Sequence, residues 1–233
     1  MNIYLITAAC VASSMMTFAH SEVEALAASA AVSVINGLTD SYHPCQIVAD
    51  LFTVYEHKGT LDGLTIAYLG DGNNVTHSWL TAAERYGFHF RVGTVVGNDP
   101  DPKVLEQARK TARGKVEVVR DPREAVRGAD VLYTDVWASM GQKDKADENR
   151  RRLQAFQINS ELLRAAKPDA IVLHCLPAVR GEEITDEVMD GPQCKAFDQA
   201  ENRLHAQKAL MHMLLVELAG RSKDSRKQAF QSA

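Results

Sequence analysis

The sequence contains only four cysteines, and they lie far apart, at Cys10, Cys45, Cys175 and Cys194. None belongs to a CxxC pair or stands at metal-ligand spacing with a histidine, so the pattern predicts neither a disulfide framework nor a metal site. We interpret the cysteines as reduced thiols of a cytoplasmic protein.

Long apolar runs and N-terminal positive charge are also missing. The apolar opening segment, residues 1–18, has no Lys or Arg before its apolar run, which a secretory signal peptide would have. The run is also shorter than the roughly 20 apolar residues of a membrane-spanning helix. We therefore predict a protein that is neither secreted nor bound to a membrane.

Charge of neither sign dominates the chain. It has 26 Lys and Arg against 30 Asp and Glu, a net charge of −4, and both signs are scattered. No basic stripe could follow a phosphate backbone, which argues against nucleic acid as a partner. The turn GDGNNVTHS (residues 70–78) is no GxGxxG and has no acidic ribose ligand at the expected distance, so a dinucleotide site is disfavoured.

From residue 61 onward the sequence alternates short β-rich runs with amphipathic helical stretches. This alternation is typical of α/β proteins in which a doubly wound parallel sheet carries helices on both faces. With 233 residues, 45% of them hydrophobic, the chain can form one full domain and part of another. The predicted strands are residues 64–69, 88–95, 115–119, 131–136, 170–175 and 195–198; the predicted helices are residues 75–86, 102–112, 122–126, 160–166 and 184–189.

Further elements flank this domain. HPCQIVADLFTVYEHKG predicts a helix with His43 at the cap and Pro44 at the first helical position, and RLHAQKALMHMLLVELAG predicts a long helix with an apolar face. The first forty residues predict a strand (3–11), a helix (21–31) and a short strand before Asn36. We therefore divide the chain into residues 1–42, the α/β domain at 43–202, and a C-terminal helix and tail at 203–233.

Polar segments follow four of the predicted strands: GDGNN, DVWASMG, HCLPAVRG and DQAENR. Ligands of open α/β sheets bind at the carboxyl ends of the strands, so these segments predict one site. His43 and Gln46, one turn apart at a helix N-terminus, could bind an anion or a polarised carbonyl, or could be a cap and a solvated side chain. Asn73 and Asn74 could bind an amino-acid head group or could fill a left-handed turn.

The remaining candidates are also open to two interpretations. Asp135 ends an apolar strand, so its carboxylate needs a partner and could bind a substrate ammonium; Asp135 and Ser139 could instead cap a following helix. Cys175 could be a nucleophile, but no His-Asp pair is evident beside it, and we favour a binding role. The Leu-Pro step at Leu176 predicts an extended turn. Arg203 offers a planar donor fork for a carbonyl or phosphate oxygen, or is a surface residue.

Five segments together match one family in order and spacing. HPCQ, GDGNN with a following HS, DVWASMGQ, HCLPAVRGEEI and DQAENRLHAQKALM resemble the ornithine carbamoyltransferases of the aspartate/ornithine carbamoyltransferase superfamily, from about Phe18 to about Leu215. The DGNN and SMG segments distinguish this group from the aspartate carbamoyltransferases, which share the fold.

The resemblance implies transfer of the carbamoyl group of carbamoyl phosphate to the δ-amine of L-ornithine, giving L-citrulline and phosphate, with no metal or organic cofactor. This is a step of arginine biosynthesis or of the urea cycle. It also implies that residues 43–202 bind ornithine, that residues 1–42 are a remnant of the carbamoyl-phosphate domain, and that the family forms trimers.

The resemblance also assigns residues. It places ornithine against Asn74, Asp135, Ser139 and Met140, and carbamoyl phosphate against His43, Gln46, Cys175, Leu176 and Arg203. Of these, Asp135, Cys175 and Arg203 would take part in catalysis.

Two departures from the family pattern bear on activity. The family binds phosphate with a Ser-Thr-Arg-Thr loop, which these 233 residues do not contain, and with an arginine where this chain has the uncharged Met16. We therefore expect an N-terminally truncated relative that is weak or inactive alone. The alternatives are a non-catalytic ornithine-binding or regulatory homologue that pairs with a complete chain, and a carbamoyltransferase for another amine such as putrescine or lysine.

Overall fold

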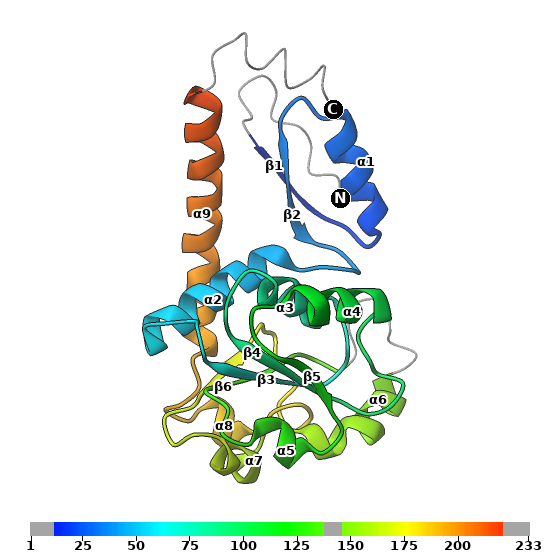
Figure 1. Ribbon diagram of the computed structural model, residues 1–233, viewed down its shortest axis with the longest axis vertical. Helices are drawn as coiled ribbons and strands as arrows, with labels where there is room; N and C mark the ends of the chain where they lie inside the picture. The colour runs from blue at the N-terminus through cyan, green and yellow to red at the C-terminus, as the bar shows by residue number, and fades with distance from the viewer. Residues whose placement is uncertain (1–11, 138–145, 221–233) are drawn as a thin grey trace.

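The computed structural model describes residues 12–137 and 146–220. Its main domain is an α/β unit around a five-stranded parallel sheet (Figure 1). The strands are β3 (Thr65–Leu69), β4 (His89–Gly93), β5 (Val116–Val119), β6 (Val131–Thr134) and β7 (Ile171–His174), and their order is β5-β4-β3-β6-β7. The chain winds from β3 outward to β5 and then returns to the other side of β3, so the switch point lies between β3 and β6.

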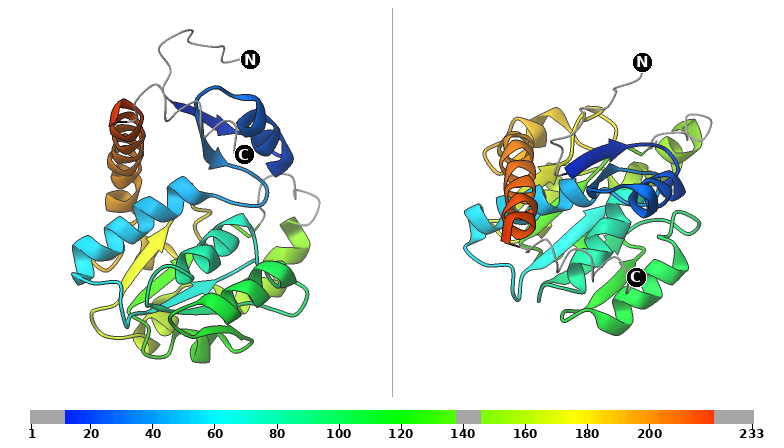
Figure 2. Two further views of the ribbon diagram at one scale, coloured as in Figure 1. Left: turned by 45° about the horizontal axis from the view of Figure 1, so that its top comes forward. Right: turned by 90° about the horizontal axis from the view of Figure 1, so that it is seen from above.

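Helices cover both faces of this sheet (Figure 2). Along β3, Ile66 and Tyr68 pack on one side with α2 (Pro44–Lys58), α3 (Asn74–Ala83) and α4 (Pro102–Thr111). The alternate residues Ala67 and Leu69 pack on the other side with α5 (Pro122–Val126), α6 (Ala146–Leu153), α7 (Ser160–Ala165) and α8 (Asp186–Met189). Both sets are fully buried, so β3 is apolar from Ile66 to Leu69, as a strand covered on both faces requires. The predicted doubly wound α/β fold is confirmed.

The predicted strand at residues 195–198 is wrong. This segment begins α9 (Ala196–Gly220), and only a single bridge joins Cys194 to Val172 of β7. The Gln199 N–H donates to the Lys195 carbonyl at 2.9 Å, so helical hydrogen bonding starts there, and the acidic Asp198 stabilises the first turn of the helix. The 3-10 turn Gln154–Phe156 and helix α6 were not predicted from the sequence.

The N-terminal part forms a small βαβ unit. Strand β1 (Ala12–Met16) runs parallel to β2 (Ser33–Leu38), and α1 (His20–Ser29) connects them. The predicted strand at residues 3–11 lies outside the described residues. Helix α9 packs against α2 and rises beside β1 and β2 (Figure 1). No helix in the described ranges combines the length and apolarity that crossing a membrane would require.

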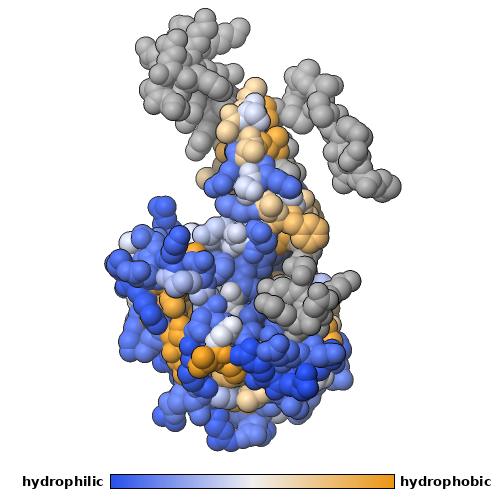
Figure 3. Space-filling view, turned by 90° about the vertical axis from the view of Figure 1, so that its right-hand side faces the viewer, coloured by the Kyte–Doolittle hydropathy of each residue, from blue (hydrophilic) through white to orange (hydrophobic). Residues whose placement is uncertain are grey.

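Apolar side chains are distributed unevenly over the surface. In the face shown in Figure 3 the α/β domain is mostly hydrophilic, whereas hydrophobic side chains are more frequent on the part of the molecule above it. Exposed apolar residues in that upper part include Met16, Phe18, Met211 and Met213. The α/β domain therefore has a covered core, while the N-terminal unit and α9 leave apolar surface in contact with solvent.

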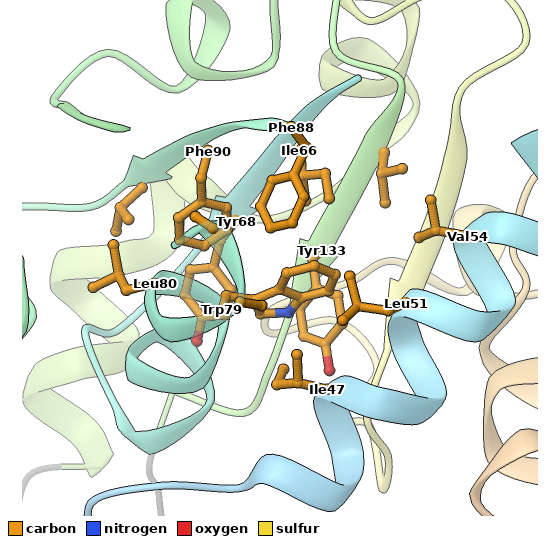
Figure 4. Close-up of a cluster of buried hydrophobic side chains, with 14 of the residues drawn as sticks. Ile47, Leu51, Val54, Ile66, Tyr68, Trp79, Leu80, Phe88, Phe90 and Tyr133 are labelled. Atoms are coloured by element: carbon orange, nitrogen blue, oxygen red, sulfur yellow. The ribbon is translucent and has the colours of Figure 1, made fainter. Parts of the chain in front are cut away.

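An aromatic cluster forms the core between the sheet and α3 (Figure 4). The ring of Trp79 lies 5.4 Å from that of Tyr133, 5.7 Å from Phe88 and 6.0 Å from Phe90, centroid to centroid. Edge-to-face and offset contacts of this kind are favourable beyond the burial of area. The cluster anchors α3, whose N-terminus faces the cleft described next.

Candidate active site

The carboxyl ends of β3, β6 and β7 open into one cleft of about 560 Å³. It lies at the switch point of the sheet, where open α/β folds bind their ligands. Predicted site residues that line it are His43, Asn74, Asp135, Cys175 and Leu176. Gln46 and Arg203 do not line it, and Ser139 and Met140 lie outside the described residues.

Asn73 joins the turn after β3 to the end of β6. Its Oδ1 accepts from the N–H groups of Val75 at 3.0 Å and Thr76 at 3.1 Å, so it caps α3, and its φ of −89° is not left-handed. Its Nδ2 donates to Asp135 Oδ2 at 2.7 Å. The preceding Gly72 is required because a Cβ there would lie 2.2 Å from the backbone nitrogen of Pro100.

Asn74 faces the N-terminal unit. Its Nδ2 donates to the Thr39 carbonyl at 2.7 Å, and both residues line the cleft. The cleft therefore has one wall from the α/β domain and another from the segment after β2.

Asp135 is a buried carboxylate at the bottom of the cleft, with 8% of its surface exposed. Besides the Asn73 amide, it accepts from Cys175 Sγ at 3.0 Å and from the Val136 N–H at 2.8 Å. Within the described residues it forms no ion pair with Lys, Arg or His. A buried carboxylate held only by neutral donors favours binding of a cation.

The Cys175 thiol donates to Asp135. Burial, and then the charge of Asp135, raise the pKa of Cys175 well above its usual value. The thiol therefore stays protonated at neutral pH and is no thiolate nucleophile. A protonated thiol can donate a hydrogen bond, and a binding role for Cys175 stays a prediction.

Buried side chains hold the loop that follows β7. Leu176 has a φ of 59°, so the predicted extended backbone at this residue is wrong. Its N–H donates to His174 Nδ1 at 2.9 Å, and His174 Nε2 donates to Glu183 at 3.0 Å, with both of these side chains fully buried. The hydrogen bond to His174 holds Leu176 in a conformation that a leucine rarely adopts alone.

His43, Gln46 and Arg203 gather where α2 meets α9. Gln46 is buried, and Arg203 Nη1 donates to Gln46 Oε1 at 2.6 Å. His43 Nδ1 and Arg203 Nε are buried and have no hydrogen-bond partner among the described residues. These unsatisfied buried polar atoms, one of them on the cleft-lining His43, indicate a place for a ligand where α2 meets α9.

Burial, and then the charge of Arg203, lower the pKa of His43 to about 4. A histidine whose pKa is lowered on folding binds its proton less readily in the folded than in the unfolded chain. The stability it contributes is thus complete above pH 6.5, its ordinary pKa, and is lost as the pH falls toward 4.

We expect His43→Gln to flatten this acid loss of stability. Between about pH 6.5 and 4 the wild-type protein should lose about 3 kcal/mol more unfolding free energy than the variant, at about 1.4 kcal/mol per pKa unit. Urea unfolding at several pH values measures the difference. The control is His212→Gln, an exposed histidine of α9. If the unfolding free energy changed with pH equally in the wild type and in His43→Gln, the result would contradict a neutral, buried imidazole at His43.

Two buried residues beside this group were not predicted from the sequence. Asp50 lies one turn after Gln46 on α2, and Gln199 lies one turn before Arg203 on α9. Asp50 is fully buried and accepts from the Nε2 atoms of Gln46 and Gln199, each at 2.7 Å. The only signal in the sequence was a charged residue on the apolar face of the helix.

The sequence and the fold match those of known proteins. Residues 62–214 match the family model of the Asp/Orn-binding domain of aspartate/ornithine carbamoyltransferase. The chain belongs to this family. Residues 4–56 match the carbamoyl-P binding domain of the same family.

The relatives belong to the ornithine branch of this family. The chain is 54% identical to the ornithine carbamoyltransferase of Syntrophus aciditrophicus over 199 residues, which cover 85% of this chain and 66% of the relative. It is similar to the structure of the Pyrococcus furiosus enzyme, with a TM-score of 0.82, 50% identity, and coverage of 86% of this chain and 65% of that one. A Campylobacter jejuni anabolic enzyme superposes with a TM-score of 0.84 at 32% identity, covering 90% and 70%. The chain thus spans about two thirds of the length of its curated relatives.

Proposed function

We propose that the cleft binds L-ornithine and that the chain supplies the ornithine side of an ornithine carbamoyltransferase. The observation that carries this proposal is Asp135, a buried carboxylate whose donors among the described residues are all neutral, in the same cleft as Asn74. Ornithine brings an ammonium for the carboxylate and a carboxylate for amide donors. Ser139 and Met140 would complete the ornithine site.

In the reaction, the neutral δ-amine of ornithine attacks the carbonyl carbon of carbamoyl phosphate. The new C–N bond forms, the bond from carbon to the phosphate oxygen breaks, and phosphate leaves with the electron pair. The proton that the amine loses ends on the departing phosphate, which is released as hydrogen phosphate. Such a reaction depends on positioning and on stabilisation of the developing oxyanion. No metal or organic cofactor takes part in this proposal.

The carbamoyl end would contact His43, Gln46 and Arg203. With its pKa near 4, His43 is neutral at neutral pH, so it does not protonate the attacking amine. Arg203 supplies fixed positive charge for an oxyanion, and Gln46 supplies an amide. Cys175 and Leu176 would line the junction of the two substrates, with Cys175 as a hydrogen-bond donor.

We further propose a cytoplasmic enzyme of arginine metabolism. The cysteines Cys45, Cys175 and Cys194 are free thiols, which is usual in a reducing compartment. A second candidate function is that of a non-catalytic ornithine-binding partner of a complete homologue, since these 233 residues contain no Ser-Thr-Arg-Thr segment.

Calorimetric titration with L-ornithine and with putrescine tests the substrate. Putrescine keeps the terminal amine but has no α-amino and α-carboxylate groups. We expect heat of binding with ornithine and much weaker binding of putrescine. Equal affinities would show that Asp135 and Asn74 do not bind the amino-acid head group. If neither ornithine nor putrescine bound, the proposed function would be overturned.

Asp135→Asn should weaken ornithine binding by about 1.5–3 kcal/mol, the usual contribution of a hydrogen bond to a charged group. Asparagine keeps the shape of the side chain but cannot offset the charge of an ammonium. The matched control is Asp130→Asn, because Asp130 is also buried and lies at the opposite end of β6, beside Lys167. Unchanged affinity in Asp135→Asn would show that this carboxylate does not contact ornithine.

A further inference from the structure

Asp50 is a charged side chain in an apolar environment. It is fully buried between α2 and α9, next to Tyr133 of β6. A carboxylate in such a place is costly unless donors surround it. Its Oδ1 accepts from two of them, Gln46 Nε2 on α2 and Gln199 Nε2 on α9.

These two contacts fix which way each glutamine amide points. An ionised carboxylate only accepts hydrogen bonds, so both glutamines must turn their NH2 groups toward Asp50. The carbonyl oxygen of each amide then points away from it. Gln46 Oε1 accepts from Arg203 Nη1 at 2.6 Å, and Gln199 Oε1 accepts from the backbone N–H of His174 at 2.9 Å.

The reverse orientation of Gln46 would be unfavourable. Its NH2 group would then face the guanidinium of Arg203, donor against donor, and Arg203 would lose the acceptor that holds Nη1. The orientation of Gln199 has a similar consequence, because His174 immediately precedes Cys175 of the cleft. One carboxylate therefore orients both the amide that accepts from Arg203 and the amide that accepts from the backbone just before Cys175.

We infer that Asp50 is a positioning residue that orients the amides of Gln46 and Gln199 and thereby holds Arg203 in place beside His43. The functional meaning of this position rests on the proposed function, in which Gln46 and Arg203 contact the carbamoyl group. Asp50 does not line the cleft, and in this inference it acts through Gln46 and Gln199 and not by contact with a substrate.

The charge of Asp50 should also respond to pH. Burial raises its pKa to about 7, while hydrogen bonds from Gln46, Tyr133 and Gln199 and the charge of Arg203 oppose that rise. The other titratable groups facing it are Tyr133 and Cys175, whose own pKa values lie well above neutral. A titration near pH 7 that is shared by Gln46, Gln199 and Arg203 would thus report on Asp50.

Proton–nitrogen NMR of the whole chain tests this between about pH 5 and 9, the range around a pKa of about 7. In the wild type, the side-chain NH2 signals of Gln46 and Gln199 and the Nε–H signal of Arg203 should shift with one midpoint near 7. Asp50→Asn should abolish this shared shift. The Arg203 signal should then stay at the same position at every pH, because the side-chain carbonyl oxygen of the new asparagine can still accept from both glutamines. Asp50→Ala should move the Arg203 signal.

The matched control is Thr53→Val. Thr53 is equally buried on α2 and contacts Asn202 of α9, and its variant should keep the wild-type titration. A wild type without a common midpoint, or a shared titration that persists in Asp50→Asn, overturns the inference. So does an Arg203 signal that Asp50→Ala leaves unmoved. None of these readings needs substrate, so failure of ornithine binding would overturn the proposed function separately.

Discussion

Citrulline formation by the purified 233-residue chain should be below easy detection even at saturating L-ornithine and carbamoyl phosphate. The phosphate of carbamoyl phosphate leaves as an anion, and donors must hold it as its bond to carbon breaks. Of the residues proposed for carbamoyl phosphate, His43, Gln46 and Arg203 address its carbamoyl end, and Cys175 and Leu176 line the junction of the two substrates.

The expected loss is large because each fixed donor to a developing charge contributes a factor of about 10²–10³ in rate. The family's Ser-Thr-Arg-Thr segment does not occur in these residues, and Met16 stands where an arginine is expected. Met16 lies at the end of β1 with its side chain exposed, and a thioether cannot replace a guanidinium. Such effects are not additive, but together they should abolish measurable turnover.

The assay is colorimetric or radiochemical citrulline formation, with the full-length Pyrococcus furiosus enzyme as the positive control. Met16→Arg alone should not restore turnover, because the larger contribution comes from the loop. Turnover of about 10 s⁻¹, a median value for enzymes, would show that other residues of this chain form a phosphate site. Ornithine binding without turnover would fit the proposed division of roles.

Trp79→Ala should destabilise the α/β domain by about 3–5 kcal/mol, the range for large aromatic residues truncated in a core. Trp79 is fully buried and contacts Phe88, Phe90 and Tyr133 (Figure 4). Its Nε1 has no hydrogen-bond partner among the described residues, so the loss comes from packing. Since domains are stable by only about 5–15 kcal/mol, the variant would be close to unfolding.

Urea unfolding of the wild type and two variants measures this loss. Trp79→Phe keeps an aromatic ring in the cluster and should cost less than the alanine variant. Tyr86→Ala removes a half-exposed aromatic side chain just after α3 and should cost about 0.5 kcal/mol or less. A loss below about 1 kcal/mol in Trp79→Ala would contradict a tightly packed aromatic core.

The sheet and the place of the cleft could be predicted from local pattern. Apolar runs such as residues 131–134, separated by amphipathic stretches, predicted parallel strands, and five of the six strands predicted after residue 61 are present. The strand predicted at residues 195–198 was wrong because so short a segment, Lys-Ala-Phe-Asp, can begin a helix as well as form a strand. Its helical hydrogen bonds, from Gln199 back to Lys195, decide between them.

The chemistry of the cleft was only partly predictable. That Asp135 needs a partner followed from its place at the end of an apolar strand, but that its partners are Asn73 and Cys175 did not. From the sequence, Asn73 could be either a ligand contact or a turn residue. The structure shows that it caps α3. Pairings of this kind depend on which strands become neighbours.

By itself, the sequence determined the elements with strong local periodicity and the family, because the apolar spacing of each element and the motif residues are local properties. Only the tertiary structure decided that Asp50 meets Gln199, which is 149 residues away, and that Gln46 meets Arg203, which is 157 residues away. Such contacts arise when α9 packs against α2 and excludes water from polar side chains between them. Burial then raises the pKa of Asp50 and lowers that of His43, and neither change is encoded in the residues adjacent to them in the chain.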